Sequence, residues 1–138
     1  MTIIDPPAAA ALTAAAFEQF AALPEHRDKR LEFIAGSIAD VVSNDISSEL
    51  AVILSTYLRI WARDTQLGRV RGADGGYVVG DARYMPDVSY ISKARMPKPA
   101  NAAWVPIAPD LAVEVISPSD APSHLRVKVV DYLNAGAV

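Results

Sequence analysis

The sequence predicts an α/β domain in which a mixed central sheet is flanked by helices. Two segments, 47–63 and 123–135, carry apolar residues at helical spacing, and short strand-like runs lie before and between them. Residues 110–117 (DLAVEVIS) place apolar residues on both faces of a strand, which is typical of a strand that is central and buried. With 138 residues, 51% of them hydrophobic, the chain can bury one core of this kind but not two.

The composition excludes several kinds of site and partner. The absence of cysteine excludes disulfides and thiolate zinc sites, so any metal must bind oxygen or one of the two histidines. A net charge of -3 argues against coating nucleic acid by bulk electrostatics, although a nuclease needs only a locally basic cleft. No apolar run approaches the roughly 20 residues that cross a bilayer, so we expect a cytoplasmic protein without membrane contact.

The domain is predicted to begin at Thr13. Residues 1–12 contain two prolines and a run of alanines, and we expect a disordered leader there. Thr13 can cap a first helix, which ends before Pro24. Residues 13–138 are then expected to form a single domain.

A hairpin and a long helix are predicted next. Strands at 30–34 and 38–42 flank Ala35-Gly36, where glycine allows the positive φ of a tight turn. The helix at 47–63 has one apolar stripe, which predicts that this face packs on the sheet. The stripe comprises Leu50, Ile53, Leu54, Tyr57, Leu58 and Trp61.

The second half is predicted to add strands and a last helix. The segment 92–109 has no period, and the strand at 110–117 is expected to be central and buried. The helix at 123–135 follows, with Gly136 as its C-terminal cap. Because a helix that leaves a central strand normally leads back into the sheet, we expect a domain whose C-terminal strands are missing. Turn residues separate three earlier strands, at 69–72, 77–79 and 84–91.

Two carboxylates on neighbouring strands point to a metal site. Glu114 lies in the middle of the apolar strand, where an ionised carboxylate is costly unless a cation accompanies it. Asp87 follows Pro86 at the start of another strand and supplies the second acid that a hard cation such as Mg²⁺ needs. A buried Glu114 paired with a basic side chain is the structural alternative.

Lys128 and Glu32 are the further candidates. Lys128 falls between Leu125 and Tyr132, inside the apolar stripe of the last helix, where its ammonium can either reach the carboxylates or extend out to solvent. Glu32 points away from its apolar neighbours on the first strand of the hairpin and is a candidate for another acid in the site.

Other residues that can carry chemistry lack a supporting context. His26 and His124 stand outside any metal-binding or nucleophile motif, and both are interpreted as surface residues. The glycines after Asp74 are interpreted as a turn, because no GK[ST] follows them. Trp104, among prolines, is interpreted as the anchor of a long loop, with base stacking as the alternative.

The order of these segments resembles the Uma family of restriction-endonuclease-like proteins. The resemblance covers residues 13–138 and rests mainly on YMPDVSYIS around Asp87 and PDLAVEVISPSD around Glu114, together with RLEFIAGSI and KVVDYLNAG. It implies the PD-(D/E)xK fold and a magnesium-dependent or manganese-dependent endonuclease that hydrolyses DNA through a metal-activated water. Restriction-type nucleases often act as dimers, which leaves a homodimer open for this chain.

The resemblance also implies roles for individual residues. Asp87 and Glu114 correspond to the two motif acids and would bind the metal, with the carbonyl of Val115 completing the coordination. Ile116 stands where the motif lysine is usual, and Lys128 corresponds to the lysine that the family takes from the following helix. Glu32 corresponds to the acid of the family's early strand.

Two departures from the family pattern keep other functions open. Family members usually read IDGE where this chain has IAGS from Ile34, and usually have a histidine where Ser47 stands. A degenerate domain that binds nucleic acid or a protein without cleavage is the first alternative. The second is a structural domain in which Glu114 and Lys128 form a buried ion pair; replacing Glu114 by Gln would destabilise that domain but would relieve repulsion in a metal site.

Overall fold

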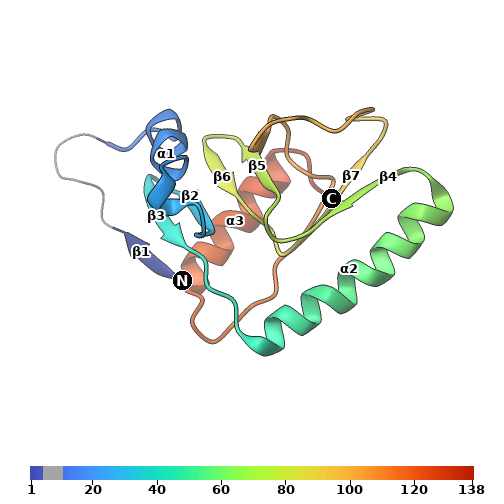
Figure 1. Ribbon diagram of the computed structural model, residues 1–138, viewed down its shortest axis with the longest axis horizontal. Helices are drawn as coiled ribbons and strands as arrows, with labels where there is room; N and C mark the ends of the chain where they lie inside the picture. Colours follow the sequence, from blue (N-terminus) through green and yellow to red (C-terminus); the bar gives the residue numbers. More distant parts are fainter. Residues whose placement is uncertain (5–10) are drawn as a thin grey trace.

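The computed structural model describes residues 1–4 and 11–138, which form strands of two sheets and three long helices (Figure 1). None of the helices in this part of the chain is both long enough and apolar enough to cross a membrane. The elements in chain order are β1 (Thr2–Ile4), α1 (Ala14–Ala21), η1 (Pro24–His26), β2 (Leu31–Ile34), β3 (Ser37–Asp40), α2 (Asp45–Thr65), β4 (Gly68–Arg71), β5 (Gly76–Val79), β6 (Ala82–Tyr84), β7 (Val88–Ser92), β8 (Trp104–Val105), β9 (Leu111–Val113) and α3 (Pro122–Asn134).

The strands form one sheet in the order β1-β3-β2-β6-β5-β8 and another in the order β4-β7-β9. All described neighbours are antiparallel except β5 and β8, which run parallel and make the larger sheet mixed. Residues 85–87 connect β6 in the larger sheet to β7 in the smaller sheet. The short connection brings the two sheets together at this point of the chain.

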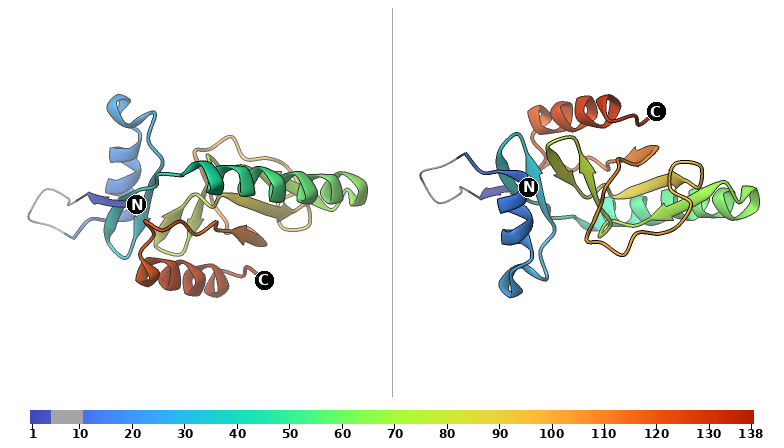
Figure 2. Two further views of the ribbon diagram at one scale, coloured as in Figure 1. Left: turned by 90° about the horizontal axis from the view of Figure 1, so that it is seen from below. Right: turned by 90° about the horizontal axis from the view of Figure 1, so that it is seen from above.

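Helices α1 and α3 cover opposite faces of the larger sheet, and β2 lies between them (Figure 2). Because side chains alternate along a strand, Leu31 and Phe33 pack in the cluster under α1, whereas Glu32 and Ile34 face α3. The predicted hairpin is confirmed, with φ of 48° at Ala35 and 83° at the following glycine in its turn.

The main hydrophobic core lies between the two sheets and α3, and a smaller cluster lies under α1. The rings of Tyr84 and Tyr132 pack at a tilt of 56° with their centroids 5.4 Å apart, which fixes α3 on the sheet. The smaller cluster consists of Phe17, Leu31, Phe33 and Ile38. The main core contains Ile34, Ala39, Tyr77, Val79, Ala82, Tyr84, Ile91, Met96, Val105, Ala108 and Tyr132.

Helix α2 was predicted correctly, but the face expected to pack on the sheet was wrong. The helix covers β4 and β7 of the smaller sheet, where Trp61 meets Tyr90 edge-on at 5.2 Å. Large apolar side chains of the predicted stripe stay 44–72% exposed, and only Leu58 of that stripe is half-buried. The face that contacts the sheet is made mostly of small residues, namely Ser47, Ala51, Ser55, Leu58 and Ala62.

The strand predicted at 110–117 is shorter and lies elsewhere in the sheet than expected. Strand β9 covers only three residues, all half-buried, and occupies the end of the β4-β7-β9 order rather than its centre. Glu114 lies directly after β9 instead of in the middle of the strand. The predicted strand at 84–91 is likewise divided into β6 and β7, because the chain changes sheet at 85–87.

The N-terminal segment also differs from the expected disordered leader. Thr2–Ile4 forms β1, which pairs antiparallel with β3. Residues 5–10 of the predicted leader lie outside the described residues. Thr13 caps α1 as predicted, its hydroxyl accepting from the amide of Ala16 at 3.1 Å.

Candidate active site

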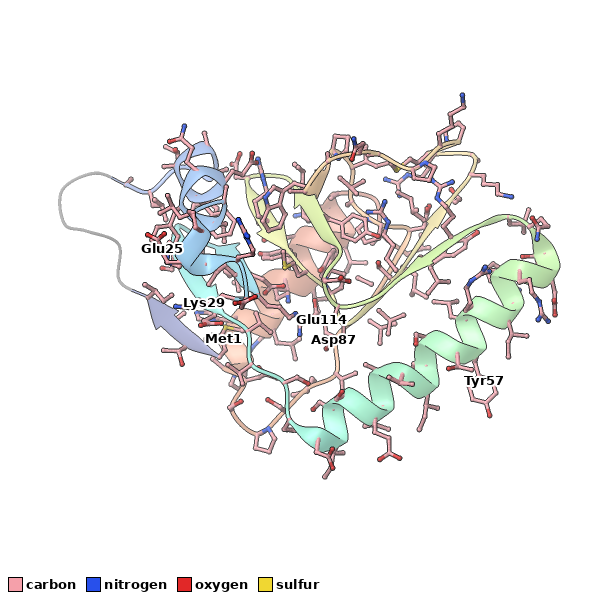
Figure 3. The ribbon with its side chains drawn as sticks, viewed as in Figure 1. Met1, Glu25, Lys29, Tyr57, Asp87 and Glu114 are labelled. Carbon is pink, nitrogen blue, oxygen red and sulfur yellow. The ribbon has the colours of Figure 1, made fainter. Side chains whose placement is uncertain are left out.

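The register between β7 and β9 brings Asp87 and Glu114 together. The antiparallel pairing ends at Val88 opposite Val113, so the next positions outward, Asp87 and Glu114, lie across from each other. Figure 3 shows both side chains at the centre of the molecule, near the lower end of the sheet. Both residues also line one pocket, which holds about 40 Å³ and includes Val115 and Lys128 in its wall.

Asp87 is held by a main-chain amide and by an arginine. Its Oδ2 accepts from the backbone N–H of Val115 at 2.8 Å, which locks the two strand ends to each other. Its Oδ1 lies 3.4 Å from Nη2 of Arg30. The sequence predicted the Val115 carbonyl as a metal ligand; the observed contact uses the amide of the same residue, and the carbonyl's role stays a prediction.

Lys128 lies at the centre of the charged groups. Its Nζ donates to both Glu32 oxygens, at 3.0 and 2.9 Å, and lies 2.7 Å from Oε1 of Glu114. Its side chain is only 5% exposed and its ammonium lies 5.2 Å from the ring centroid of Tyr84. The ammonium thus turns inward to the carboxylates rather than extending out to solvent.

Glu32 is the most deeply buried acid of the cluster, with no exposed side-chain surface. Besides Lys128, its Oε1 accepts from the backbone N–H of Met85 at 2.6 Å. Glu32 comes from the larger sheet, and Met85 begins the segment that leads into the smaller sheet. The carboxylate therefore holds Lys128 in position and does not itself line the pocket beside Asp87.

The charges of the cluster change the protonation of its members. Burial raises the pKa of Glu114 to about 7; the carboxylates of Glu32 and Asp87 raise it as well, and Lys128 acts against them. Burial alone would lower the pKa of Lys128, but Glu32 and Glu114 outweigh it, and the pKa of the ammonium is raised. Lys128 therefore stays charged at neutral pH, whereas Glu114 titrates near neutrality.

Tyr132 gives Glu114 a further neutral donor. Its hydroxyl lies 3.1 Å from Oε1 of Glu114. Burial, together with the charge of Glu114, raises the pKa of Tyr132 well above its ordinary value, so the phenol keeps its proton. Oxygen Oε1 thus receives Lys128 and Tyr132 together, and Oε2 has no partner among the described residues.

Arg30 is a site residue that the sequence interpretation missed. It lines the pocket, its Nη2 donates to the carbonyl of Met85 at 2.9 Å, and its buried Nε has no hydrogen-bond partner among the described residues. In the sequence it stands in a short basic group with Arg27 and Lys29, both of which are exposed. The available signal was its position two residues before Glu32, which puts both side chains on one face of an extended chain.

The residues interpreted as unrelated to the site lie outside the cluster. His26 points back to the carbonyl of Phe20 at 2.7 Å, and His124 lies near Met1. Trp104 packs against Phe17, with ring centroids 5.5 Å apart, so it anchors β8 to the core under α1.

The pocket is compatible with a hard divalent cation. Magnesium typically binds one or two protein carboxylates, with water and substrate phosphate completing the octahedron. The ionisable side chains that line the pocket are those of Arg30, Asp87, Glu114, Asp120 and Lys128, and Glu32 pairs with Lys128 from outside it. The described part of the chain contains no group of three His, Cys, Asp or Glu residues that could share a metal. The donor set therefore fits a site of two carboxylates.

Comparisons with known proteins agree with the fold. The chain superimposes on the crystal structure of a putative nuclease of the DUF820 family from Anabaena variabilis with a TM-score of 0.78 and 22% identity, over 91% of this chain and 70% of that chain. This likeness shows the restriction-endonuclease-like fold. A search among curated proteins gave no significant match. The family model described as "Putative restriction endonuclease" matches residues 17–137. This chain therefore belongs to the Uma family.

Proposed function

We propose that this chain is a metal-dependent DNA endonuclease that hydrolyses phosphodiester bonds. The main supporting observation is the β7–β9 register, which sets Asp87 and Glu114 opposite each other with Lys128 on the oxygen of Glu114. Two acids and a lysine around one pocket are the elements of the PD-(D/E)xK site that the family description suggests.

Asp87, Glu114 and the carbonyl of Val115 would hold Mg²⁺ or Mn²⁺. When bound, the ion supplies Lewis-acid chemistry, polarising the phosphoryl group and lowering the pKa of water. Burial, and after it the nearby carboxylates, raises the pKa of Glu114 to about 7, and a bound cation would counter both effects by stabilising the ionised carboxylate. Its Oε2, for which the described part of the chain offers no partner, is the oxygen left for the ion.

Lys128 acts in this proposal through its positive charge and not as a general base. Because its pKa is raised, its ammonium stays protonated at neutral pH and can orient the attacking water or stabilise the charge that develops on the phosphate. Glu32 acts through Lys128 as a positioning residue, since both its oxygens hold the ammonium.

Arg30 is suited to bind the phosphate of the substrate. Its Nη2 donates to the chain and its Nε is buried, whereas its Nη1 has no hydrogen-bond partner among the described residues. A phosphate oxygen in the pocket would satisfy this donor with a charge-assisted hydrogen bond. This contact would position the scissile phosphate next to Asp87.

A catalytically degenerate domain that binds nucleic acid or a protein is the second candidate. Two departures from the family pattern favour it: Ala35 and Ser37 replace the acids of IDGE, and Ser47 stands where a histidine is usual. Such a domain would bind the metal without cleaving DNA.

Calorimetric titration of Mn²⁺, combined with plasmid nicking on the same samples, tests the proposal. Wild-type protein is expected to bind Mn²⁺ and nick DNA, and Asp87→Ala and Glu114→Ala to lose both activities. Glu25→Ala, which removes an exposed acid remote from the pocket, is the control and should retain both. Binding without nicking would support the degenerate domain, and a folded wild-type protein that does not bind Mn²⁺ would refute the metal site.

A further inference from the structure

Helix α2 carries a continuous apolar face that the described chain leaves exposed. Figure 1 shows the helix along the lower right edge of the molecule, and Figure 3 shows Tyr57 pointing away from the body. The face consists of Ile46, Leu50, Ile53, Tyr57 and Ile60, which are 44–72% exposed and are called the α2 seam below. Monomeric proteins rarely expose apolar patches of this extent without a function.

The spacing of the α2 seam is that of a helix that pairs with another helix. Successive seam residues are four, three, four and three positions apart, which is the a/d repeat of coiled coils. At about 100° per residue, the α2 seam centres about 140° round the helix from the small residues that contact the sheet. The helix can therefore bind a partner along its length while it keeps its contact with β4 and β7.

We propose that the α2 seam is a dimer interface, in which α2 packs antiparallel against α2 of a second copy of this chain. The adjacent exposed parts of Leu54 and Trp61 widen this apolar surface along the length of the helix, and a standard interface buries about 800 Å² on each partner.

The charges beside the α2 seam select the antiparallel direction. Glu49 and Arg63 occupy the equivalent heptad position next to the seam, at opposite ends of the helix. In the antiparallel pair, Leu50 lies opposite Ile60 and Ile53 lies opposite Tyr57. Glu49 of each copy then lies beside Arg63 of the other, so the dimer has two such ion pairs, one at each end. In a parallel pair Glu49 would face Leu54 instead.

Arg63 is available for this contact. It lies 2.8 Å from Asp64 of its own helix, but both side chains are about 60% exposed. An exposed ion pair between sequence neighbours contributes little to stability. Arg63 can therefore leave Asp64 and pair with Glu49 of the second copy at little cost in free energy. The two-fold axis of this arrangement passes near Thr56, whose side chain is exposed and bonded only to its own helix.

Light scattering and sedimentation equilibrium on the whole chain test the proposal. Wild-type protein is expected to be dimeric, and Ile53→Glu and Tyr57→Glu to weaken the dimer by at least about tenfold while keeping the far-UV circular dichroism of the wild type. Val52→Glu is the matched control, because Val52 is 62% exposed on the same helix but lies outside the α2 seam. A folded wild-type monomer, or a dimer that resists both seam variants, would overturn the proposal.

Charge reversal and cross-linking test the direction of pairing. Glu49→Arg and Arg63→Glu should each weaken the dimer at low salt, and the double variant should restore it. Because the chain has no cysteine, Thr56→Cys gives a single reporter, which should form an intermolecular disulfide on oxidation. Ser48→Cys, exposed on the side of the helix away from the seam, should not. Failure of the double variant to recover would exclude the antiparallel register.

Discussion

Lys128 is the residue on which the cluster depends, and it was found in the sequence by a conflict between its charge and its apolar neighbours. The conflict is resolved in the structure by two acids from different elements, Glu32 and Glu114. Arg30 and the backbone amide of Met85 had no such signal, because their roles depend on which strands become neighbours. Unusual single residues can thus be detected locally, whereas their partners cannot.

Replacing Lys128 by methionine is expected to destabilise the protein by about 3–5 kcal/mol, because Glu32 is left buried without its counter-ion. Urea denaturation at pH 7 measures the change. The double variant Lys128→Met/Glu32→Gln should recover part of the loss, and Lys29→Met, at an exposed lysine, should have little effect. A cost as small as that of Lys29→Met would mean that the buried pair does not hold α3 to β2.

Replacing Glu114 by glutamine should stabilise the metal-free protein at pH 8. The pKa of this carboxyl is about 7 in the folded chain against an ordinary value of 4.5, so its stabilising effect is complete below pH 4.5 and is lost as the pH rises to about 7. Glutamine does not ionise, so the variant avoids this loss of stability. Its free energy of unfolding should exceed that of the wild type by up to about 3 kcal/mol above pH 7 and should differ little at pH 4. Thermal unfolding across this pH range is the measurement. Lower stability of the variant at pH 8 would favour the purely structural ion pair between Glu114 and Lys128.

At the scale of the elements, the sequence predicted those that depend on local signals. The Thr13 cap, the Ala35-Gly36 turn and the long second helix all carry such signals, and all are present. Periodicity could not tell which side of α2 meets the sheet, because small residues pack there and large ones stay outside. Periodicity also could not show that β9 lies at the end of the sheet order rather than at its centre, since an apolar segment does not reveal how many neighbouring strands it has.

The hairpin turn contains an avoidable strain that a single substitution should relieve. Ala35 adopts φ of 48°, a conformation in which a Cβ costs roughly 1–2 kcal/mol. Ala35→Gly removes this cost but adds freedom to the unfolded chain, so a net gain of about 0.5–1 kcal/mol is expected in thermal or urea unfolding. Ala22→Gly, at a helix end with φ of -80°, is the control and should lose stability. Loss of stability in both variants would argue against the left-handed turn.

At the scale of the whole molecule, the candidate site lies where the two sheets meet. Glu32 belongs to the larger sheet, Asp87 and Glu114 adjoin strands of the smaller sheet, and Lys128 reaches them from α3. The family match covers the segments that carry these residues, but the charge balance of the candidate site depends on packing between these parts of the fold. A change at the site is therefore expected to alter the junction between the sheets as well as the chemistry.

Binding of Mg²⁺ should consequently protect this junction from hydrogen exchange. Strand β9 has three residues and a described partner on one side only, so local opening there should be easier than in the core under α1. A ligand that binds only the closed form raises the opening free energy, by about 2.7 kcal/mol at a hundred times its Kd. Exchange at residues 85–88 and 113–116 should slow on adding Mg²⁺, while Phe17 and the rest of α1 remain unchanged. The effect should be absent in Asp87→Ala, and equal slowing in that variant would show that the ion acts somewhere other than between Asp87 and Glu114.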